Sequence, residues 1–193
     1  MNKSEVNYKE NEEFYVYHVV TERELKVGQH IFFDGENLNG VGKRVNEKKE
    51  IVEDIYKNPQ AYKIEKLEHH TKVALRELAL EKVRKEKFSN YPSRMSCLYV
   101  SDNYENAETW SSFFVEWKRP TFSIVRLKVK GRKFIGDAFN CFEATTNEEE
   151  NCALAENYWL NKPNPLNKPP LHEFLVDGEI EVVEILKVIN KNM

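Results

Sequence analysis

The chain has 193 residues, of which 40% are hydrophobic and 32% charged, and its formal net charge is −3 at pH 7. These totals are typical of a globular protein with one sizeable core. No apolar run is long enough to span a membrane, residues 1–13 lack the apolar core of a signal peptide, and three cysteines without a CxxC pair indicate neither a zinc site nor a disulfide framework. We therefore expect a cytoplasmic protein with no bound metal and no membrane contact.

The first predicted element is a strand over residues 14–20, FYVYHVV, which follows a polar and flexible tail over residues 1–13. Strand geometry places His18 on the same face as apolar side chains. A polar ring in that position needs a hydrogen-bond partner, which is either another protein group or a ligand. A second extended piece is predicted for residues 30–33, after a turn at residues 26–29.

A loop and a helical insertion are predicted next. Residues 34–44 are rich in glycine and asparagine, and the exposed amides of this loop, together with Arg44, could reach a phosphate group. Apolar residues at helical spacing predict one helix over residues 45–57 and, after an Asn-Pro start, another over residues 59–88. These helices form an insertion over residues 45–90. Its excess of lysine and arginine also permits contact with nucleic acid.

The rest of the chain alternates strands with helices. Tyr99 lies near the end of a strand predicted for residues 95–101, and Asp137 follows a strand predicted for residues 133–136. The other expected elements are a helix after Asp102 or Asn103, a strand over 121–130, a helix from Thr146 or Asn147 to Trp159, an irregular loop over 161–170, and strands over 171–176 and 179–188. Strands interrupted by helices, with hairpin links near the C-terminus, predict an α+β fold with a mixed or antiparallel sheet.

Four segments of the chain resemble the ADP-ribosyltransferase superfamily, whose members carry a histidine, a tyrosine and an acidic residue on successive core strands. The segments read YHVVTERELKVGQHI, CLYVSDNYENAETW, SIVRLKV and LHEFLVDGEIEVVEI. Their layout is similar to that of the rifampicin-modifying enzymes, and the segment from Glu173 to Val176 is similar to the acidic segment of toxins that ADP-ribosylate thymidine in DNA. The chain also resembles a bacterial family of unknown function over nearly its whole length. The resemblance implies a single ADP-ribosyltransferase-like domain over residues 14–193 with a split sheet.

The resemblance also implies that NAD is a substrate, and it gives five residues a role in binding NAD. His18 would hydrogen-bond the ribose on the adenosine side, and Thr21 would support the same end of the molecule. Tyr99 would stack on the nicotinamide ring, with Ser101 just beyond it. Arg44 would meet the pyrophosphate.

Three residues remain open as the catalytic acid that the resemblance implies. Glu173 fits the toxin-like ending and is the first choice, Asp137 fits the rifampicin-modifying enzymes and is the second, and Glu179 fits an alignment on the final strand. The carboxylate would stabilise the oxocarbenium-like cation that forms when the bond between nicotinamide and ribose breaks. The expected function is transfer of ADP-ribose from NAD to an acceptor, which is a protein, a nucleic acid or a small molecule. The alternatives are a fold relative that binds a nucleotide or hydrolyses NAD without transfer, and a regulatory or nucleic-acid-binding module.

Overall fold

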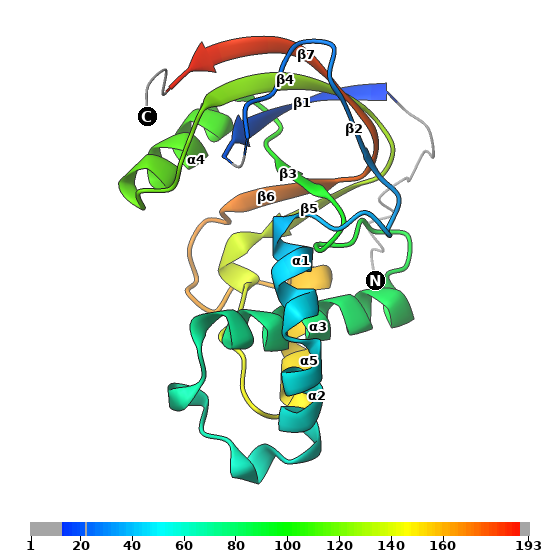
Figure 1. The fold of residues 1–193 in the computed structure, drawn as a ribbon, viewed down its shortest axis with the longest axis vertical. Helices are drawn as coiled ribbons and strands as arrows, with labels where there is room; N and C mark the ends of the chain where they lie inside the picture. Colours follow the sequence, from blue (N-terminus) through cyan, green and yellow to red (C-terminus); the bar gives the residue numbers. More distant parts are fainter. Residues whose placement is uncertain (1–12, 22, 190–193) are drawn as a thin grey trace. The chain divides into compact units, whose positions relative to one another are not determined.

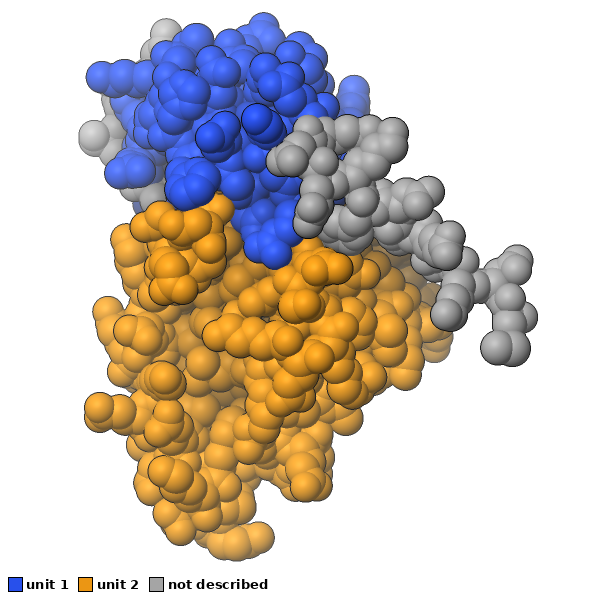
Figure 2. Space-filling view, turned by 90° about the vertical axis from the view of Figure 1, so that its right-hand side faces the viewer, with its two compact units in different colours: residues 1–32, 100–133, 176–193 blue, residues 33–99, 134–175 orange. Residues whose placement is uncertain are grey.

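The chain divides into two compact units, each built from separate segments of the sequence (Figure 2). The computed structural model describes residues 13–21 and 23–189, so residues 1–12 of the predicted N-terminal tail lie outside the described residues. Unit 1 combines residues 1–32, 100–133 and 176–193, and unit 2 combines residues 33–99 and 134–175. The prediction that residues 14–193 form one domain stays a prediction.

Unit 1 contains a four-stranded sheet. Its strands lie in the order β1 (Glu13–Val20), β4 (Ser123–Lys130), β7 (Gly178–Val188) and β2 (His30–Phe33), with Phe33 the first residue of unit 2 (Figure 1). The pairings of β4 with β1 and with β7 are antiparallel. Strand β4 lies inside the sheet and its sequence, SIVRLKVK, is rich in the β-branched residues that favour strands. This sheet confirms the strands that were predicted for residues 14–20, 30–33 and 179–188.

Helix α4 (Tyr104–Glu116) packs on this sheet in unit 1 (Figure 1). Its first turn begins where predicted, because the side chain of Asn103 accepts a hydrogen bond from the backbone N–H of Asn106 at 2.8 Å. Val19, Ala107 and Ile124 form the buried contact between helix and sheet, and Tyr17, Tyr104, Trp110 and Phe114 pack around it.

Unit 2 is built on four α-helices: α1 (Gly40–Glu47), α2 (Lys49–Lys57), α3 (His69–Lys87) and α5 (Glu148–Trp159). Two buried clusters hold them together. One joins α3 to α5 through Leu80, Val83, Tyr158 and Trp159, and the other joins α1, α2 and α3 through Val45, Val52, Ile55 and Leu75. Helix α5 ends at Trp159 and is capped by Asn147, whose side chain accepts from the N–H of Glu150 at 3.1 Å, as predicted.

The single helix predicted over residues 45–57 is divided at Lys48 between α1 and α2. Two further predictions in the helical part of unit 2 are wrong. The predicted helix over residues 59–88 is instead two short 3₁₀ turns, η1 (Pro59–Ala61) and η2 (Ile64–Lys66), followed by α3 from His69. The Asn-Pro start does open a turn, but the chain becomes extended at Tyr62, with φ −117° and ψ 143°, and this ends the turn.

The predicted loop over residues 34–44 is the second error, because α1 already begins at Gly40. The side chain of Asn39 accepts from the N–H of Gly42 at 2.9 Å and so caps this helix. The same side chain donates to the carbonyls of Arg94 and Cys97, at 2.8 and 2.9 Å. A Cβ on Gly42 would lie 2.4 Å from the carbonyl oxygen of Met95, so glycine serves close packing here and not flexibility.

A second, three-stranded sheet lies mainly in unit 2. Its order is β3 (Leu98–Val100), β6 (His172–Val176) and β5 (Lys133–Asp137), and β5 leads into a short 3₁₀ turn, η3 (Ala138–Asn140). The predicted strand over residues 95–101 is therefore shorter than expected. The two sheets and five α-helices of the described chain confirm the α+β class. Within residues 13–21 and 23–189, no helix is both long and apolar enough to cross a membrane.

Candidate functional site

The eight predicted site residues are divided between the two units. His18, Thr21, Ser101 and Glu179 belong to unit 1, whereas Arg44, Tyr99, Asp137 and Glu173 belong to unit 2. Each unit is therefore considered for what its own residues can do.

In unit 1, strand β1 brings His18 and Ser101 to the same part of the fold. Tyr17, the neighbour of His18, exchanges two backbone hydrogen bonds with Ser101, at 2.9 and 2.7 Å. Ser101 is buried, whereas His18 is half-buried and lies opposite Val125 in the sheet. Thr21 follows the last residue of β1 and is also half-buried. The two residues proposed for the ribose end of NAD, His18 and Thr21, thus lie on β1 and directly after its end.

In unit 2, Glu173 is part of a buried group of charged and polar side chains, which we call the Arg94 cluster: Glu77, Arg94, Cys141, Tyr158 and Glu173. The guanidinium of Arg94 forms salt bridges with Glu77, at 2.9 Å, and with Glu173. The side chains of Arg94, Glu77 and Glu173 are only 7%, 1% and 12% exposed. A buried cation between two carboxylates is stable only when all its hydrogen bonds are made, so the geometry of the cluster is strongly determined.

Tyr158 and Cys141 complete the cluster around Glu173. Arg94 Nη1 donates to the hydroxyl of Tyr158 at 2.6 Å, and that hydroxyl donates to Glu173 Oε1 at 2.7 Å. Cys141 Sγ donates to the same oxygen at 3.7 Å. Burial raises the pKa of Tyr158 well above 10 and that of Cys141 to about 12, so both groups are protonated donors at neutral pH. One carboxylate oxygen of Glu173 therefore has three donors.

The structure brings Tyr99 together with Glu173 through Arg94. The Tyr99 hydroxyl donates to the backbone carbonyl of Arg94 at 3.2 Å, and the Arg94 guanidinium lies 5.4 Å from the centre of the tyrosine ring. Burial raises the pKa of Tyr99 well above 10. Arg94 therefore lies against one face of the Tyr99 ring.

Asp137 is hydrogen-bonded to residues outside the Arg94 cluster. Its carboxylate accepts from the N–H of Phe139 and of Leu171, each at 3.0 Å, and from the side chain of Asn164 at 2.7 Å. Asp137 is 7% exposed and caps the turn η3. These bonds give the Asp137 carboxylate a structural role. Asp137 therefore suits the role of catalytic acid less well than Glu173 does.

Arg44 and Glu179 are exposed residues on other elements. Arg44 lies in the last turn of α1, where it lines a small cavity of about 360 Å³ with His69 and His70. Glu179 is the second residue of β7 and pairs with Lys130 in the sheet of unit 1. In the described residues no group of three or more histidines, cysteines and acids could hold a metal ion.

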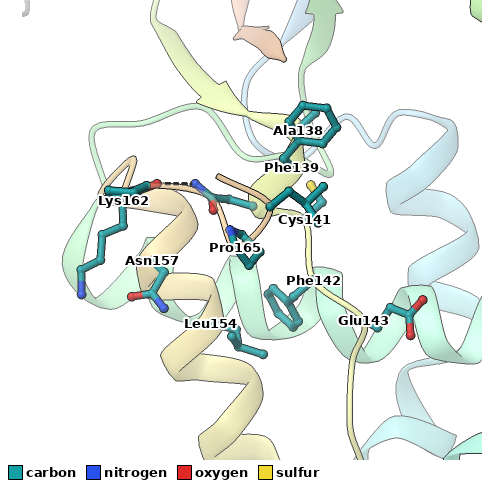
Figure 3. Close-up of a pocket in the computed structure, with 12 residues that line it drawn as sticks. Ala138, Phe139, Cys141, Phe142, Glu143, Leu154, Asn157, Lys162 and Pro165 are labelled. Atoms are coloured by element: carbon teal, nitrogen blue, oxygen red, sulfur yellow. Dashed lines mark hydrogen bonds between the residues drawn. The ribbon is translucent and has the colours of Figure 1, made fainter. Parts of the chain in front are cut away.

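A larger cavity adjoins the Arg94 cluster through Cys141, and we call it the Cys141 cavity (Figure 3). It has a volume of about 670 Å³, which is within the usual range for small-molecule sites. Its walls come from η3, from the segment after η3, from α5 and from the proline-rich loop after α5, and they are Ala138, Phe139, Asn140, Cys141, Phe142, Glu143, Leu154, Asn157, Lys162, Pro163, Pro165 and Leu166. Every wall residue belongs to unit 2.

Sequence reasoning missed most of the Arg94 cluster. Glu77 follows Ala74 and Leu75 on α3, and an acidic residue on an amphipathic helix normally indicates its solvent face. Arg94 precedes β3 in a loop, and Tyr158 lies next to Trp159, which is 2% exposed. The one available signal was the charge of Arg94 in the otherwise uncharged stretch SNYPSRMSCLYVS, which is unusual so close to a buried strand.

The buried carboxylate of Glu77 predicts that stability depends on pH. Burial would raise its pKa, but Arg94 and Arg76 outweigh burial and hold the pKa below the ordinary value of 4.5. A carboxyl group with a lowered pKa in the folded state stabilises the fold above its unfolded pKa and loses this contribution as the pH falls through the folded pKa. We expect the free energy of unfolding to fall below about pH 4.5, and to fall less steeply in Glu77→Gln. Urea unfolding over a series of pH values measures both slopes, and equal slopes would contradict this assignment.

Comparison with known proteins assigns the chain to a family. A family model described as "Protein of unknown function (DUF2441)" matches residues 16–189, which is most of the chain. This match confirms the expected membership of a family of unknown function. A search of curated proteins found no match.

Proposed function

We propose that this chain, which belongs to the DUF2441 family, is an NAD-binding ADP-ribosyltransferase-like protein that transfers ADP-ribose to an acceptor. The chemistry needs a carboxylate beside the ribose of NAD, where positive charge develops as nicotinamide leaves. Glu173 is the proposed catalytic acid, and Asp137 is the second candidate. His18, Thr21 and Ser101 of unit 1, and Arg44 and Tyr99 of unit 2, are the proposed NAD-binding residues.

The observation that supports this proposal best is the fixed position of Glu173. Arg94, Tyr158 and Cys141 all donate to its Oε1, while the side chain keeps 12% of its surface exposed. A carboxylate that acts on a transition state is most effective when it is already oriented before the substrate binds, because no reorganisation is needed during the reaction. Further support comes from the order of three residues along the chain. His18 lies on β1, Tyr99 on β3 and Glu173 on β6.

A second candidate is a fold relative that binds a nucleotide or hydrolyses NAD without transfer. The Arg94 cluster favours its nucleotide-binding form, because the salt bridge between Glu173 and Arg94 offsets the negative charge that would stabilise the cation formed when NAD is cleaved. The nucleic-acid-binding alternative has less support. Lysines on and near α3 are paired with acids of unit 2, as in Lys82 with Glu148 at 2.8 Å and Lys87 with Glu156 at 2.6 Å. These pairs leave less of the basic charge for phosphates.

Release of nicotinamide from NAD tests the proposed chemistry. We expect Glu173→Gln to lower the rate by about 100-fold or more, since the variant removes the charge that stabilises the cation but keeps a similar side-chain shape. Glu116→Gln, at an exposed acid of unit 1 with no proposed role in the reaction, is the matched control and is expected to keep the rate. Asp137→Asn is expected to lower the melting temperature more than the rate, because its carboxylate accepts three hydrogen bonds in the fold.

The other outcomes separate the candidates. Full turnover in Glu173→Gln would show that Glu173 is not the catalytic acid, and a lost rate in a stable Asp137→Asn would transfer that role to Asp137. If NAD raises the melting temperature of the wild-type protein but no nicotinamide is released, the protein is the nucleotide-binding relative. Release of nicotinamide together with free ADP-ribose, in every acceptor mixture tried, would identify NAD hydrolysis.

A further inference from the structure

We propose that the Cys141 cavity is a binding site for a planar, apolar molecule that carries an anionic oxygen group, such as an aromatic carboxylate. The proposal concerns unit 2 alone and does not depend on NAD chemistry. It rests on three features of the cavity: its size, its apolar walls, and the position of its charged side chains.

Apolar side chains form most of the cavity walls. Phe139 and Phe142 contribute aromatic rings, and Leu154 and Leu166 keep 37% and 53% of their surface exposed although they line a concave site. An apolar ligand that covers exposed leucines at a concave surface removes apolar area from water, and this makes the free energy of binding more favourable. Aromatic rings and prolines favour flat ligands because they present flat apolar faces.

The two charged side chains of the cavity wall, Lys162 and Glu143, lie on opposite sides of the cavity in Figure 3. Lys162 and Asn157 are adjacent, since the backbone N–H of Lys162 donates to the carbonyl of Asn157 at 3.1 Å, and both side chains lie on one side of the cavity in Figure 3. Glu143 lies on the other side. The ammonium of Lys162 is exposed and forms no ion pair within residues 13–21 and 23–189. An ammonium beside an amide supplies donors for a carboxylate or phosphate oxygen.

A second lysine adds positive charge to the aromatic wall. The ammonium of Lys168 lies 5.9 Å from the centre of the Phe139 ring. Glu143 is the acidic side chain among the residues that line the cavity, and its charge is opposite in sign to that of Lys162. With Lys162 on one side and Glu143 on the other, the charges favour a ligand with its anionic group near Lys162 and an apolar body over Phe142 and Leu154.

The binding of 2-naphthoate to the full chain, measured by isothermal titration calorimetry, tests the proposal. We expect saturable binding at one site, and weaker binding by about tenfold for the neutral 2-naphthamide and for the cationic 2-naphthylmethylamine. Lys162→Gln is expected to weaken naphthoate binding by about tenfold, whereas Glu143→Gln should leave it unchanged or strengthen it. Lys66→Gln is the matched control, because Lys66 is an exposed lysine of unit 2 outside the cavity.

A second variant tests the location independently of charge. Leu154→Trp enlarges a partly exposed side chain at the cavity wall, so it should abolish naphthoate binding without unfolding the protein, and near-ultraviolet circular dichroism and the melting temperature check the fold. Three outcomes would each overturn the proposal. They are a lack of saturable binding, equal affinity for the three naphthyl compounds, and unchanged affinity in a folded Leu154→Trp variant. Because the readout is binding, its failure is distinct from a failure to release nicotinamide.

Discussion

Replacing Arg94 by methionine is expected to lower the free energy of unfolding by about 3–5 kcal/mol. Arg94 lies between Glu77 and Glu173, and the side chains of all three residues are nearly or fully buried. Methionine fills part of the same volume but leaves two carboxylates without their cation, and an uncompensated buried charge is among the most destabilising changes in a protein. Urea unfolding at neutral pH, followed by circular dichroism, measures the change.

The triple variant Arg94→Met, Glu77→Gln, Glu173→Gln is the control for this experiment. It removes the buried cation and both anions together, so we expect it to recover most of the stability lost in Arg94→Met alone. Arg94→Lys should lie between the two, because an ammonium keeps the charge but cannot reach Glu77, Glu173 and the Tyr158 hydroxyl with one planar fork. If Arg94→Met were as stable as the wild type, the cluster would not be a determinant of the fold.

Replacing Trp159 by alanine is the second change expected to have a large effect, with a loss of about 3–5 kcal/mol. Trp159, the last residue of α5, is 2% exposed and packs against α3, where its indole N–H donates to the carbonyl of Leu80 at 2.9 Å. The substitution leaves a large cavity next to Leu80, Phe134 and Tyr158. Thermal and urea unfolding measure the loss.

Trp117→Ala is the matched control, since the same substitution is made at a tryptophan that is 62% exposed. Its ring stacks on Phe113 with a centroid distance of 5.9 Å, so we expect a loss below about 1 kcal/mol. Similar losses in the two variants would mean that burial does not explain the importance of Trp159.

Elements with strong local signals could be predicted from the sequence. Strand β1 is dense in aromatic and β-branched residues, and helices α4 and α5 begin at asparagine caps that depend only on residues within one turn. The start of α1 could not be predicted, because the residue that caps it also bonds to the carbonyls of Arg94 and Cys97, more than fifty positions further along the chain. A glycine-rich stretch that serves close packing has the same composition as a flexible loop.

The candidate site was predicted less completely than the fold. Glu173 and Tyr99 were identified through the resemblance, but Arg94, which contacts both, was not. Arg94 meets Glu77 across a separation of 17 residues, Tyr158 across 64 and Glu173 across 79. Contacts over such separations depend on the tertiary fold and leave no periodic pattern in the sequence.

The interleaving of the two units has a consequence for dissecting the protein. The chain changes unit between residues 32 and 33, 99 and 100, 133 and 134, and 175 and 176, so no single cut separates the units into two continuous polypeptides. A fragment that ends before residue 176 would lack β7, which pairs with the inner strand β4 of the first sheet. Gene truncation is therefore a poor way to isolate either unit, and point substitutions in the intact polypeptide are the appropriate tool.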